Sequence, residues 1–551
     1  MKQLKMSQIL SFILSKQKII FFVLTLLSGL WILSSFSDFQ YYLAQGDHGQ
    51  HLYSTKMAFD GHKPYRDFFW WYSPLMLYYY SFFYYFFGVT IQSILLGQNI
   101  LLLLSGIFIY LASSVFISPV LSFMCALWYW TQRGMDFAYT FNHPGGVLLL
   151  TIILYCLFEY FKKPRNVYVW LGALNIFLLF FVRINMALGV LVLFFIFLSI
   201  SNAFHQIPNS AKQNKFYFLL GTAVLAGSFL IYWYLLKGLP AYIIHQCFAY
   251  FKSDQVQHSY AIFPKLYDLL MMAKAFFNTN PIKRVLGGAL VLSLVQIAFS
   301  ITRKKVTEQE TRTLLFPGIC LFVLMMLCLH EFIMSGIVYR ANWAISFEAM
   351  LIFLLLESLF RLRGPLLITP LIKVSIVWMV FGVLLLSAID NYYLIESYKS
   401  PEHELIVGKN HIYTTQPLSW FKTVEQTTQF IKEHTKPSEK IFAIPYEPLY
   451  YFLAERDCAT RQTAFFLFNN ITEEQERKTI EDLEKEKVNW IILSNRIVST
   501  EYGMGIFGQT HCKILWEYIN KNFGVFTQFG EHLHESGDWA TNHSTYILKR
   551  K

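Results

Sequence analysis

The sequence predicts a mainly α-helical, polytopic membrane bundle that ends in a small water-soluble α/β domain. Hydrophobic residues make up 55% of the 551-residue chain and charged residues only 15%, whereas soluble proteins carry about 25% charged residues. Apolar runs of about 17 to 25 residues, the length that a helix needs to cross a bilayer, recur as far as Asp390. The sequence therefore divides into a transmembrane domain, residues 1–390, and a tail domain, residues 391–551.

About eleven runs are expected to cross the bilayer, within a range of about 11 to 13 helices. The first run follows a basic N-terminal head and lacks a small-residue cleavage site. It is therefore expected to be a retained anchor rather than a signal peptide. The expected crossings are residues 18–36, 92–116, 119–132, 145–161, 167–182, 185–203, 216–236, 284–301, 313–330, 343–360 and 365–389.

Loop charge predicts the orientation, because cytoplasmic loops keep an excess of Lys and Arg. Basic clusters follow the N-terminus and the expected crossings that end near residues 161, 203, 301 and 360, so these ends are expected in the cytoplasm. The large loops 38–91 and 237–283 and the tail domain then face outward. A bacterial inner membrane with a periplasmic tail is favoured, although another plasma membrane or the endoplasmic reticulum would follow the same physics.

Residues 74–88 are apolar enough to cross the membrane but would reverse the sidedness of the later basic clusters. The segment is short and rich in Tyr and Phe, and aromatic rings with a polar tip favour the headgroup boundary. We interpret it as an interfacial or half-inserted helix. The alternative is a full crossing here, compensated by a segment 119–132 that does not cross.

The tail is expected to alternate helices with short strands. Strand-like runs occupy residues 440–446, 488–494, 525–529 and 545–549, and Thr423 and Thr472 each stand three residues before a Gln, which is capping-box spacing. A phosphate loop, a nucleophile elbow and a zinc-protease motif are missing from the sequence of the tail, so an independent soluble enzyme is not expected there. Cys458 and Cys512 are left open as a disulfide, which an outward location permits.

The net charge of +11 does not point to nucleic acid, because the cytoplasmic loop clusters account for most of it. Membrane lipids are the simpler partner. The cysteines show no paired metal spacing.

The first outward loop combines charged residues with many aromatic rings, which is typical of a loop packed at a membrane surface. Asp47 follows the first crossing and begins a periodic stretch that predicts a surface helix. A carboxylate near hydrocarbon is costly unless it is paired or used chemically, so Asp47 is the leading candidate for a general base. Its alternative role is a helix N-cap. Asp67 is the second candidate, with an ion pair to Arg66 or Lys63 as its alternative, and Asp60 is expected in a turn.

Two arginines stand at outward ends of apolar runs, where a desolvated guanidinium requires an anion. Arg183 separates two such runs and suits a lipid phosphate, with an internal ion pair as the alternative. Arg340 has the same two interpretations or extends its head group to the interface. Asn142 and His143 precede Pro144 at another outward helix start, where Asn is often a cap.

The chain resembles the GT-C class of polyprenyl-phosphate-dependent glycosyltransferases, particularly the mannosyltransferase and aminoarabinose-transferase relatives. The likeness rests on Asp47 after the first helix, on the stretch from Gly61 to Phe69 (GHKPYRDFF), and on Ser73 and Pro74 at the start of the next apolar segment. The many-helix layout, the outward loop 237–283 and the α/β tail extend it over nearly the whole chain.

The resemblance implies a sugar transferase whose donor is a polyprenyl-phosphate-linked sugar and whose acceptor is a lipid, a glycan or a protein. Asp47, or secondarily Asp67, would be the catalytic carboxylate in an inverting reaction. Arg183, Lys63 and Arg340 would bind the donor phosphate. Residues implied in substrate binding are His48, His51, Tyr65, Asn142 and His143.

A metal is not implied, and no cofactor is expected. Many relatives carry a second acidic residue roughly where Asn142 and His143 stand, so a site of two carboxylates is in doubt here. Asp136 lies close by as a weaker substitute.

Three other functions compete with the transferase interpretation. A transporter or lipid flippase would line a path through the bilayer with charges and show inverted repeats. A polysaccharide polymerase or ligase would carry its key residues in a large late loop. A non-catalytic lipid-binding protein would keep binding when Asp47 is replaced.

Overall fold

The computed structural model describes residues 2–131, 141–204, 210–245, 308–335, 338–361, 370–498, 505–530 and 543–551. The chain divides into two compact units. Unit one consists of residues 1–35, 98–228 and 263–394, and unit two of residues 36–97, 229–262 and 395–551. The loop after the first helix thus shares a unit with the tail, whereas the sequence-based division at residue 390 assigned the two to different domains.

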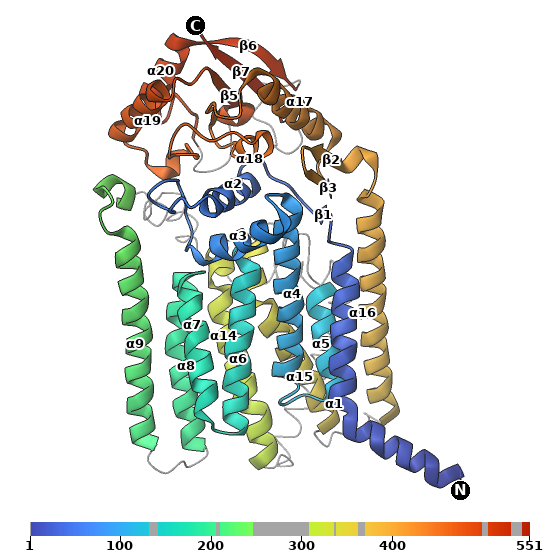
Figure 1. Cartoon of the computed structure of the whole chain (residues 1–551). Coiled ribbons are helices and arrows are strands. Elements are labelled where there is room, and N and C mark those ends of the chain that lie inside the picture. Colours follow the sequence, from blue (N-terminus) through green and yellow to red (C-terminus); the bar gives the residue numbers. More distant parts are fainter. Residues whose placement is uncertain are drawn as a thin grey trace. The chain divides into compact units, whose positions relative to one another are not determined.

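Helices dominate unit one (Figure 1). The helices with all or most of their residues there are α1 (Lys2–Ser34), α4 (Ile91–Ser113), α5 (Pro119–Thr131), α6 (His143–Lys162), α7 (Asn166–Phe180), α8 (Ile184–Phe204), α9 (Ser210–Leu236), α14 (Glu308–Ser335), α15 (Ile345–Arg361) and α16 (Pro370–Tyr398), and a 3-10 segment, η2 (Val338–Ala344), precedes α15.

Six helices of the described chain are long and apolar enough to cross a membrane, which makes the protein an integral membrane protein. They are Lys16–Ser34, Ile91–Ser113, His143–Lys162, Ile184–Ala203, Lys212–Leu236 and Val374–Tyr398. Helices form at each of the other expected crossings except 284–301, which lies outside the described residues. Among these, α5 and α7 have 13 and 15 residues, fewer than the roughly 20 that a straight crossing takes.

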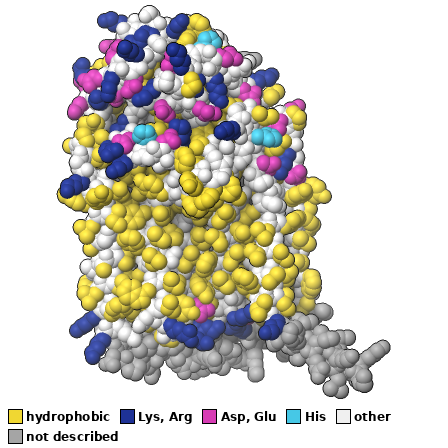
Figure 2. All heavy atoms as spheres, in the orientation of Figure 1, with side chains coloured by type: hydrophobic (Ala, Val, Ile, Leu, Met, Phe, Trp, Pro, Cys, Tyr) yellow, Lys and Arg dark blue, Asp and Glu magenta, His cyan; other side chains and the backbone are white. Residues whose placement is uncertain are grey.

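The surface of unit one has the polarity expected of helices in lipid. Hydrophobic side chains cover the helices, and Lys and Arg side chains gather at one end of them (Figure 2). One internal charge in this unit is paired: Arg361 Nε lies 3.0 Å from Glu357 Oε1, and Glu357 Oε2 accepts the Ser118 backbone N–H at 2.9 Å. A buried carboxylate is tolerated because both of its oxygens are used.

Unit two holds two sheets (Figure 1). The first has the order β1-β3-β2, in which β1 (Phe39–Gln40) pairs in parallel with β3 (Asn410–Thr414), and β2 (Glu404–Val407) pairs antiparallel with β3. The second has the order β4-β5-β7-β6, with β4 (Phe442–Ile444) parallel to β5 (Trp490–Ser494), and β7 (Thr545–Arg550) antiparallel to β5 and to β6 (Phe523–Phe529). All four predicted tail strands are confirmed, and the first sheet was not foreseen.

The helices of unit two are α2 (Asp47–Phe59), α3 (Leu75–Phe87), α17 (Leu418–His434), α18 (Leu449–Ala454), α19 (Glu473–Lys485) and α20 (Lys513–Asn522). The surface helix predicted after Asp47 is therefore confirmed as α2. It packs against α3 and α18. Through β1 and α2, the first loop is an integral part of the tail domain.

Helix α3 supports the interfacial interpretation of residues 74–88. It has 13 residues, about 20 Å at 1.5 Å per residue, which is shorter than a hydrocarbon core of about 30 Å. One side carries exposed rings, with Tyr78, Phe82 and Phe86 at 46%, 58% and 59% exposure, while Tyr80 and Tyr84 are buried. Such two-sidedness is typical of a helix lying at a membrane surface.

One of the two predicted helix starts in the tail is wrong. The capping box of Thr472 and Gln475 forms at the start of α19, but α17 begins earlier, after Pro417. Thr423 lies inside that helix, where its hydroxyl donates to the carbonyls of Ser419 and His543. The tertiary contact with His543 uses the hydroxyl that the local pattern assigned to a cap. Cys458 and Cys512 are both buried and free.

Candidate active site

Asp47 is the first residue of α2, and its carboxylate is not used to cap the helix. Gly46 occupies the N-cap position and no side-chain cap hydrogen bond forms, so the alternative role of Asp47 as an N-cap is wrong. A negative charge in a first helical turn interacts favourably with the helix dipole. Asp47 is half-buried, which leaves a carboxylate that is held by its surroundings and still partly accessible.

The neighbour of this carboxylate comes from the tail. The Tyr446 hydroxyl donates a hydrogen bond to Asp47 Oδ1 at 3.1 Å. Tyr446 is 1% exposed, and burial raises its pKa well above the ordinary value, with the nearby Asp47 charge adding to the effect. The phenol therefore stays protonated at any physiological pH and remains a donor to the carboxylate.

An aromatic cluster fixes the Tyr446 ring. Phe466 lies 5.1 Å from it and Trp71 5.3 Å, measured between ring centroids, both in edge-to-face geometry. The Arg496 guanidinium lies over the rings of Tyr446 and Phe466, 5.4 and 5.2 Å from their centroids. Such contacts orient a ring as well as stabilise it.

Two glycines allow the start of α2 to approach the tail this closely. A Cβ on Gly46 would lie 2.6 Å from both Arg496 Nη1 and Tyr446 Cδ1, and a Cβ on Gly49 would lie 2.2 Å from the Leu449 backbone nitrogen. That nitrogen donates to the Gln45 carbonyl at 3.1 Å. The backbone just before Asp47 is therefore hydrogen-bonded directly to the backbone just after Tyr446.

Sequence reasoning missed Tyr446 and Arg496, although a signal was present. Both residues follow the carboxyl ends of the parallel strands β4 and β5. Ligand-binding residues in α/β sheets gather at that edge. The predicted strands at 440–446 and 488–494 end beside these two side chains, so a parallel pairing would have placed them together.

A buried acid, Glu447, lies next to Tyr446 at the same strand end. Ser494 donates to Glu447 Oε1 at 2.6 Å, and Glu447 Oε2 is buried without a hydrogen-bond partner among the described residues. Burial raises the pKa of Glu447 to about 8, against the opposing effects of Arg496 and Ser494. The side chain is therefore mostly protonated at neutral pH, which limits the cost of burying it.

A second network holds Gln45, two residues before Asp47. Trp420 Nε1 donates to Gln45 Oε1 at 3.0 Å, so the Gln45 amide nitrogen donates to His543 Nδ1 at 3.2 Å. The Nε2 atom of His543 lies 2.7 Å from the Tyr450 hydroxyl. Burial, with Arg496 nearby, lowers the pKa of His543 to about 3. The ring is therefore neutral, so one of its nitrogens accepts a hydrogen bond and the other donates one.

The other acidic candidate of the loop is paired. Arg66 binds both oxygens of Asp67, at 2.6 and 2.8 Å, and the Lys63 backbone N–H donates to Oδ2 at 2.8 Å. These interactions, the Arg66 hydrogen bonds first, lower the pKa of Asp67. The ion-pair alternative is thus the one that the structure contains, and it weakens Asp67 as a base.

Lys63 is exposed, and Tyr65 is buried with φ +68° and donates to the Tyr72 carbonyl at 2.6 Å. His48 and His51 are buried on α2. The Ala44 N–H donates to His48 Nδ1 at 2.9 Å, and the His51 ring lies 5.8 Å from Trp70 and 5.9 Å from Tyr72. Burial lowers the pKa of His51 well below the ordinary value, so this ring is neutral. It stands one helical turn after Asp47, on the same face of α2.

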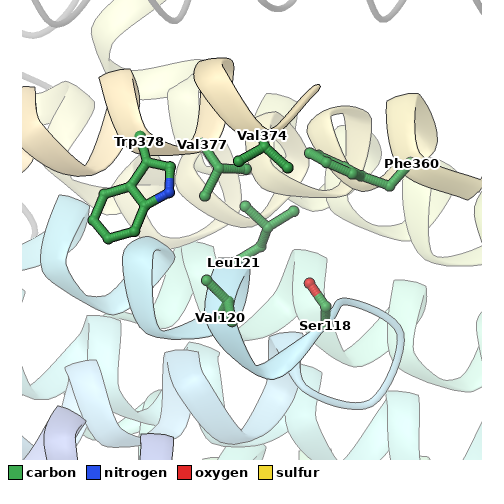
Figure 3. A pocket seen from close by; sticks show the side chains of 7 residues that line it. All are labelled: Ser118, Val120, Leu121, Phe360, Val374, Val377 and Trp378. Atoms are coloured by element: carbon green, nitrogen blue, oxygen red, sulfur yellow. The ribbon is translucent and has the colours of Figure 1, made fainter. Parts of the chain in front are cut away.

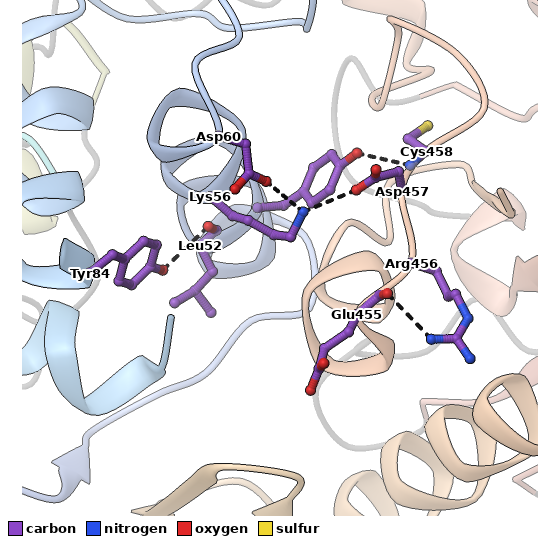
Figure 4. Close-up of polar contacts among 9 residues, drawn as sticks. Leu52, Lys56, Asp60, Tyr84, Glu455, Arg456, Asp457 and Cys458 are labelled. Atoms are coloured by element: carbon purple, nitrogen blue, oxygen red, sulfur yellow. Dashed lines mark hydrogen bonds and ion pairs between the residues drawn. The ribbon is translucent and has the colours of Figure 1, made fainter. Parts of the chain in front are cut away.

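Ion pairs hold the opposite end of α2 (Figure 4). Lys56 Nζ lies 2.8 Å from Asp60 Oδ2 and 3.1 Å from Asp457 Oδ1. The Tyr53 hydroxyl accepts the Cys458 N–H at 2.8 Å. Asp60 is the C-cap residue and Gly61 follows with φ +89°, which confirms the predicted turn.

The remaining predicted site residues belong to unit one. Arg183 lies in the turn between α7 and α8 and Arg340 in η2, both half-buried. Asn142 is the N-cap residue of α6, as expected for Asn, but makes no side-chain cap bond. The His143 ring packs 4.3 Å from the Trp343 ring of η2. The structure thus brings His143 and the segment of Arg340 together.

Several polar atoms near this end of α6 are buried without a hydrogen-bond partner in the described part of the chain. They include both amide atoms of Asn142, the indole nitrogen of Trp343 and the Ser346 hydroxyl. A buried polar group without a partner costs about 1 to 3 kcal/mol. Each of these groups is therefore available to a ligand or to water.

An apolar pocket of about 220 Å³ lies elsewhere in unit one (Figure 3). It is lined from α15, α16 and the start of α5 by Ser118, Val120, Leu121, Phe360, Val374, Val377 and Trp378. Because Phe360 is at the end of α15 away from η2, the pocket is separated from His143 and Arg340. Its lining has one hydroxyl and no charge, so it lacks the convergent polar groups of a sugar or phosphate site.

Among the described residues, no three His, Cys, Asp or Glu side chains converge as a metal site would require. Asp136 lies outside the described residues.

Comparison with known proteins identifies the architecture. No protein-family model and no curated protein matches the chain. Solved structures do match. ArnT from Cupriavidus metallidurans bound to undecaprenyl phosphate matches at 10% identity and a TM-score of 0.52, over 97% of this chain and 98% of ArnT. The oligosaccharyltransferase of Archaeoglobus fulgidus in the apo form matches at 12% identity and a TM-score of 0.51, over 96% of this chain and 75% of that protein.

Proposed function

We propose that the chain, which has the GT-C glycosyltransferase fold, is a glycosyltransferase. It transfers a sugar from a polyprenyl phosphate to an acceptor hydroxyl at the outward membrane face. The proposal rests on the half-buried Asp47 carboxylate at the start of α2. This carboxylate accepts a hydrogen bond from a neutral phenol. Among the described residues it forms no ion pair, unlike Asp60, Asp67 and Asp457. It is the position at which the GT-C resemblance implies a catalytic carboxylate.

In the proposed reaction, Asp47 takes the proton of the acceptor hydroxyl while the oxygen attacks the anomeric carbon. The bond from that carbon to the phosphate oxygen breaks, and its electron pair leaves with the lipid phosphate. The configuration at the anomeric carbon inverts because attack and departure occur on opposite faces. A general base must lie within hydrogen-bond reach of the hydroxyl, which a partly accessible carboxylate satisfies.

We assign the departing phosphate to Arg183 and Arg340, with Lys63 as a further candidate. A guanidinium that is half-buried at the end of an apolar helix gains most from an anion that neutralises it. Lys63 is the weaker candidate because its exposed ammonium is screened by water. The buried amide of Asn142, which has no hydrogen-bond partner among the described residues, is suited to substrate hydroxyl groups, since it offers both a donor and an acceptor.

The test is sugar transfer in proteoliposomes from a panel of polyprenyl-phosphate sugars to lipid, glycan and peptide acceptors. We compare wild type with Asp47→Asn, which removes the base with little change in shape, and with Asp67→Asn as a matched carboxylate of the same loop. We expect one donor to be consumed, turnover to fall at least a hundredfold in Asp47→Asn, and Asp67→Asn to keep most of it. Equal activity of Asp47→Asn and wild type would refute the assignment.

The same assay tests metal dependence. We propose that the reaction needs no divalent metal, so activity in EDTA should equal untreated activity. Complete loss in EDTA with recovery on adding Mn²⁺ or Mg²⁺ would overturn this.

A further inference from the structure

We infer that Tyr446 of the tail is a positioning residue for Asp47, held in place by Arg496, so that the tail completes the catalytic site rather than merely covering it. This rests on the proposed function, because it assigns Asp47 the role of base. The contacts within unit two carry it.

The hydrogen bond between the two side chains has a fixed direction, from the Tyr446 hydroxyl to Asp47. Asp47 has two rotatable side-chain torsions and lies at the first residue of a helix, where no cap bond fixes it. Among the described residues, its carboxylate accepts one hydrogen bond, from the Tyr446 hydroxyl to Oδ1 at 3.1 Å. That bond occupies Oδ1 and orients Oδ2, the oxygen left for an acceptor proton.

Tyr446 is itself rigid. Its ring is enclosed by Phe466, Trp71 and the Arg496 guanidinium at 5.1 to 5.4 Å. The remaining members of this hydrophobic cluster are Phe69, Ala464 and Phe468. A packed ring holds its hydroxyl at a fixed point, whereas an exposed tyrosine would not.

The backbone segments that carry Asp47 and Tyr446 are also held together. Leu449 N donates to Gln45 O at 3.1 Å, and Gly46 leaves only enough room for Arg496 and the Tyr446 ring against the start of α2. An error of about 1 Å in the place of a catalytic group costs about a hundredfold in rate. A fixed donor on a fixed backbone is the means to prevent such an error.

The experiment measures kcat, KM and the pH-rate profile of Tyr446→Phe in the full-length protein, with the donor found for wild type. The variant keeps the ring in its cluster and removes only the hydroxyl. We expect kcat to fall about tenfold to a hundredfold with the donor KM unchanged. The acid limb should move to higher pH, because a hydroxyl donor stabilises a carboxylate over its protonated form.

Tyr451→Phe is the matched control. The Tyr451 hydroxyl is equally buried in the tail and accepts the Ala443 N–H at 2.7 Å, and it makes no contact with Asp47. Its loss should lower the melting temperature without changing kcat or the pH profile. Arg496→Lys, which keeps the charge but loses the flat group over the ring, should change both in the same direction as Tyr446→Phe, by less.

The outcomes separate the two proposals. If Asp47→Asn is inactive while Tyr446→Phe has the kcat and acid limb of wild type, the positioning role is wrong and the base assignment stands. If Asp47→Asn keeps wild-type turnover, the proposed function of Asp47 fails. Loss of kcat in Tyr451→Phe equal to that in Tyr446→Phe would reduce the effect to tail stability and overturn the inference.

Discussion

The two ends of α2 are fixed to the tail by different kinds of contact. At its first residue, Asp47 meets a neutral hydroxyl in an aromatic cluster, and close backbone packing does the fixing. In the last turn of α2, Lys56 forms ion pairs with Asp60 and Asp457. Salt bridges hold charges by neutralising them, whereas the hydroxyl at the first end orients a carboxylate and leaves its charge in place. A carboxylate can therefore stay available as a base at the first end of α2 but not at the second.

Breaking the first end should have the largest effect. In Gly49→Ala the new methyl group meets the Leu449 backbone nitrogen at 2.2 Å, and backbone cannot move aside as a flexible side chain does. We expect a loss of about 3 kcal/mol in the free energy of unfolding and a matching loss of active protein, measured by thermal denaturation and turnover. Gly382→Ala, which meets nothing within 4 Å, is the control and should be neutral or slightly stabilising. A fully stable Gly49→Ala protein would contradict the close packing.

The buried acid behind Tyr446 should make the first end sensitive to pH. Because the pKa of Glu447 is about 8 in the folded protein against an ordinary value of 4.5, the folded state binds the proton more tightly. Its stability therefore falls as pH rises from about 4.5 to about 8. Glu447→Gln should remove this dependence and melt about 3 °C higher than wild type at pH 9, as measured by thermal denaturation across pH. Parallel curves for the two proteins would show that Glu447 does not titrate in this range.

Breaking the second end should have the smallest effect. Lys56→Met removes both ion pairs and keeps the apolar stem of the side chain. Since Asp60 and Asp457 are partly exposed, the expected loss is about 1 kcal/mol, seen as a small drop in melting temperature, with kcat within twofold of wild type. A kcat reduced as far as in Tyr446→Phe would erase the distinction between the two ends.

The sequence was sufficient for features that depend on local pattern. Hydrophobic run length predicted the helices of unit one, six of which are long and apolar enough to cross a membrane in the described part of the chain. The periodic stretch after Asp47 predicted α2, and β-branched runs predicted the four tail strands. The GT-C resemblance agrees with the fold of the similar solved structures. These properties follow from composition within about twenty residues.

What could not be predicted depends on contacts between distant segments. Tyr446 lies 399 positions from Asp47 in the sequence, and nothing local ties the two together. Strand β1 has only two residues and forms by pairing with β3, so its own sequence carried no strand signal. Thr423 was misassigned for the same reason, because its partner His543 is 120 residues away.

The role of Asp47 as the base is tested most directly by comparing the two ends of α2 in one assay. Asp47→Asn and Asp60→Asn remove one carboxylate each from the same helix, and turnover is measured at saturating donor in the same proteoliposomes. We expect a loss of at least a hundredfold for Asp47→Asn and turnover within twofold of wild type for Asp60→Asn. Equal turnover in both variants would contradict it.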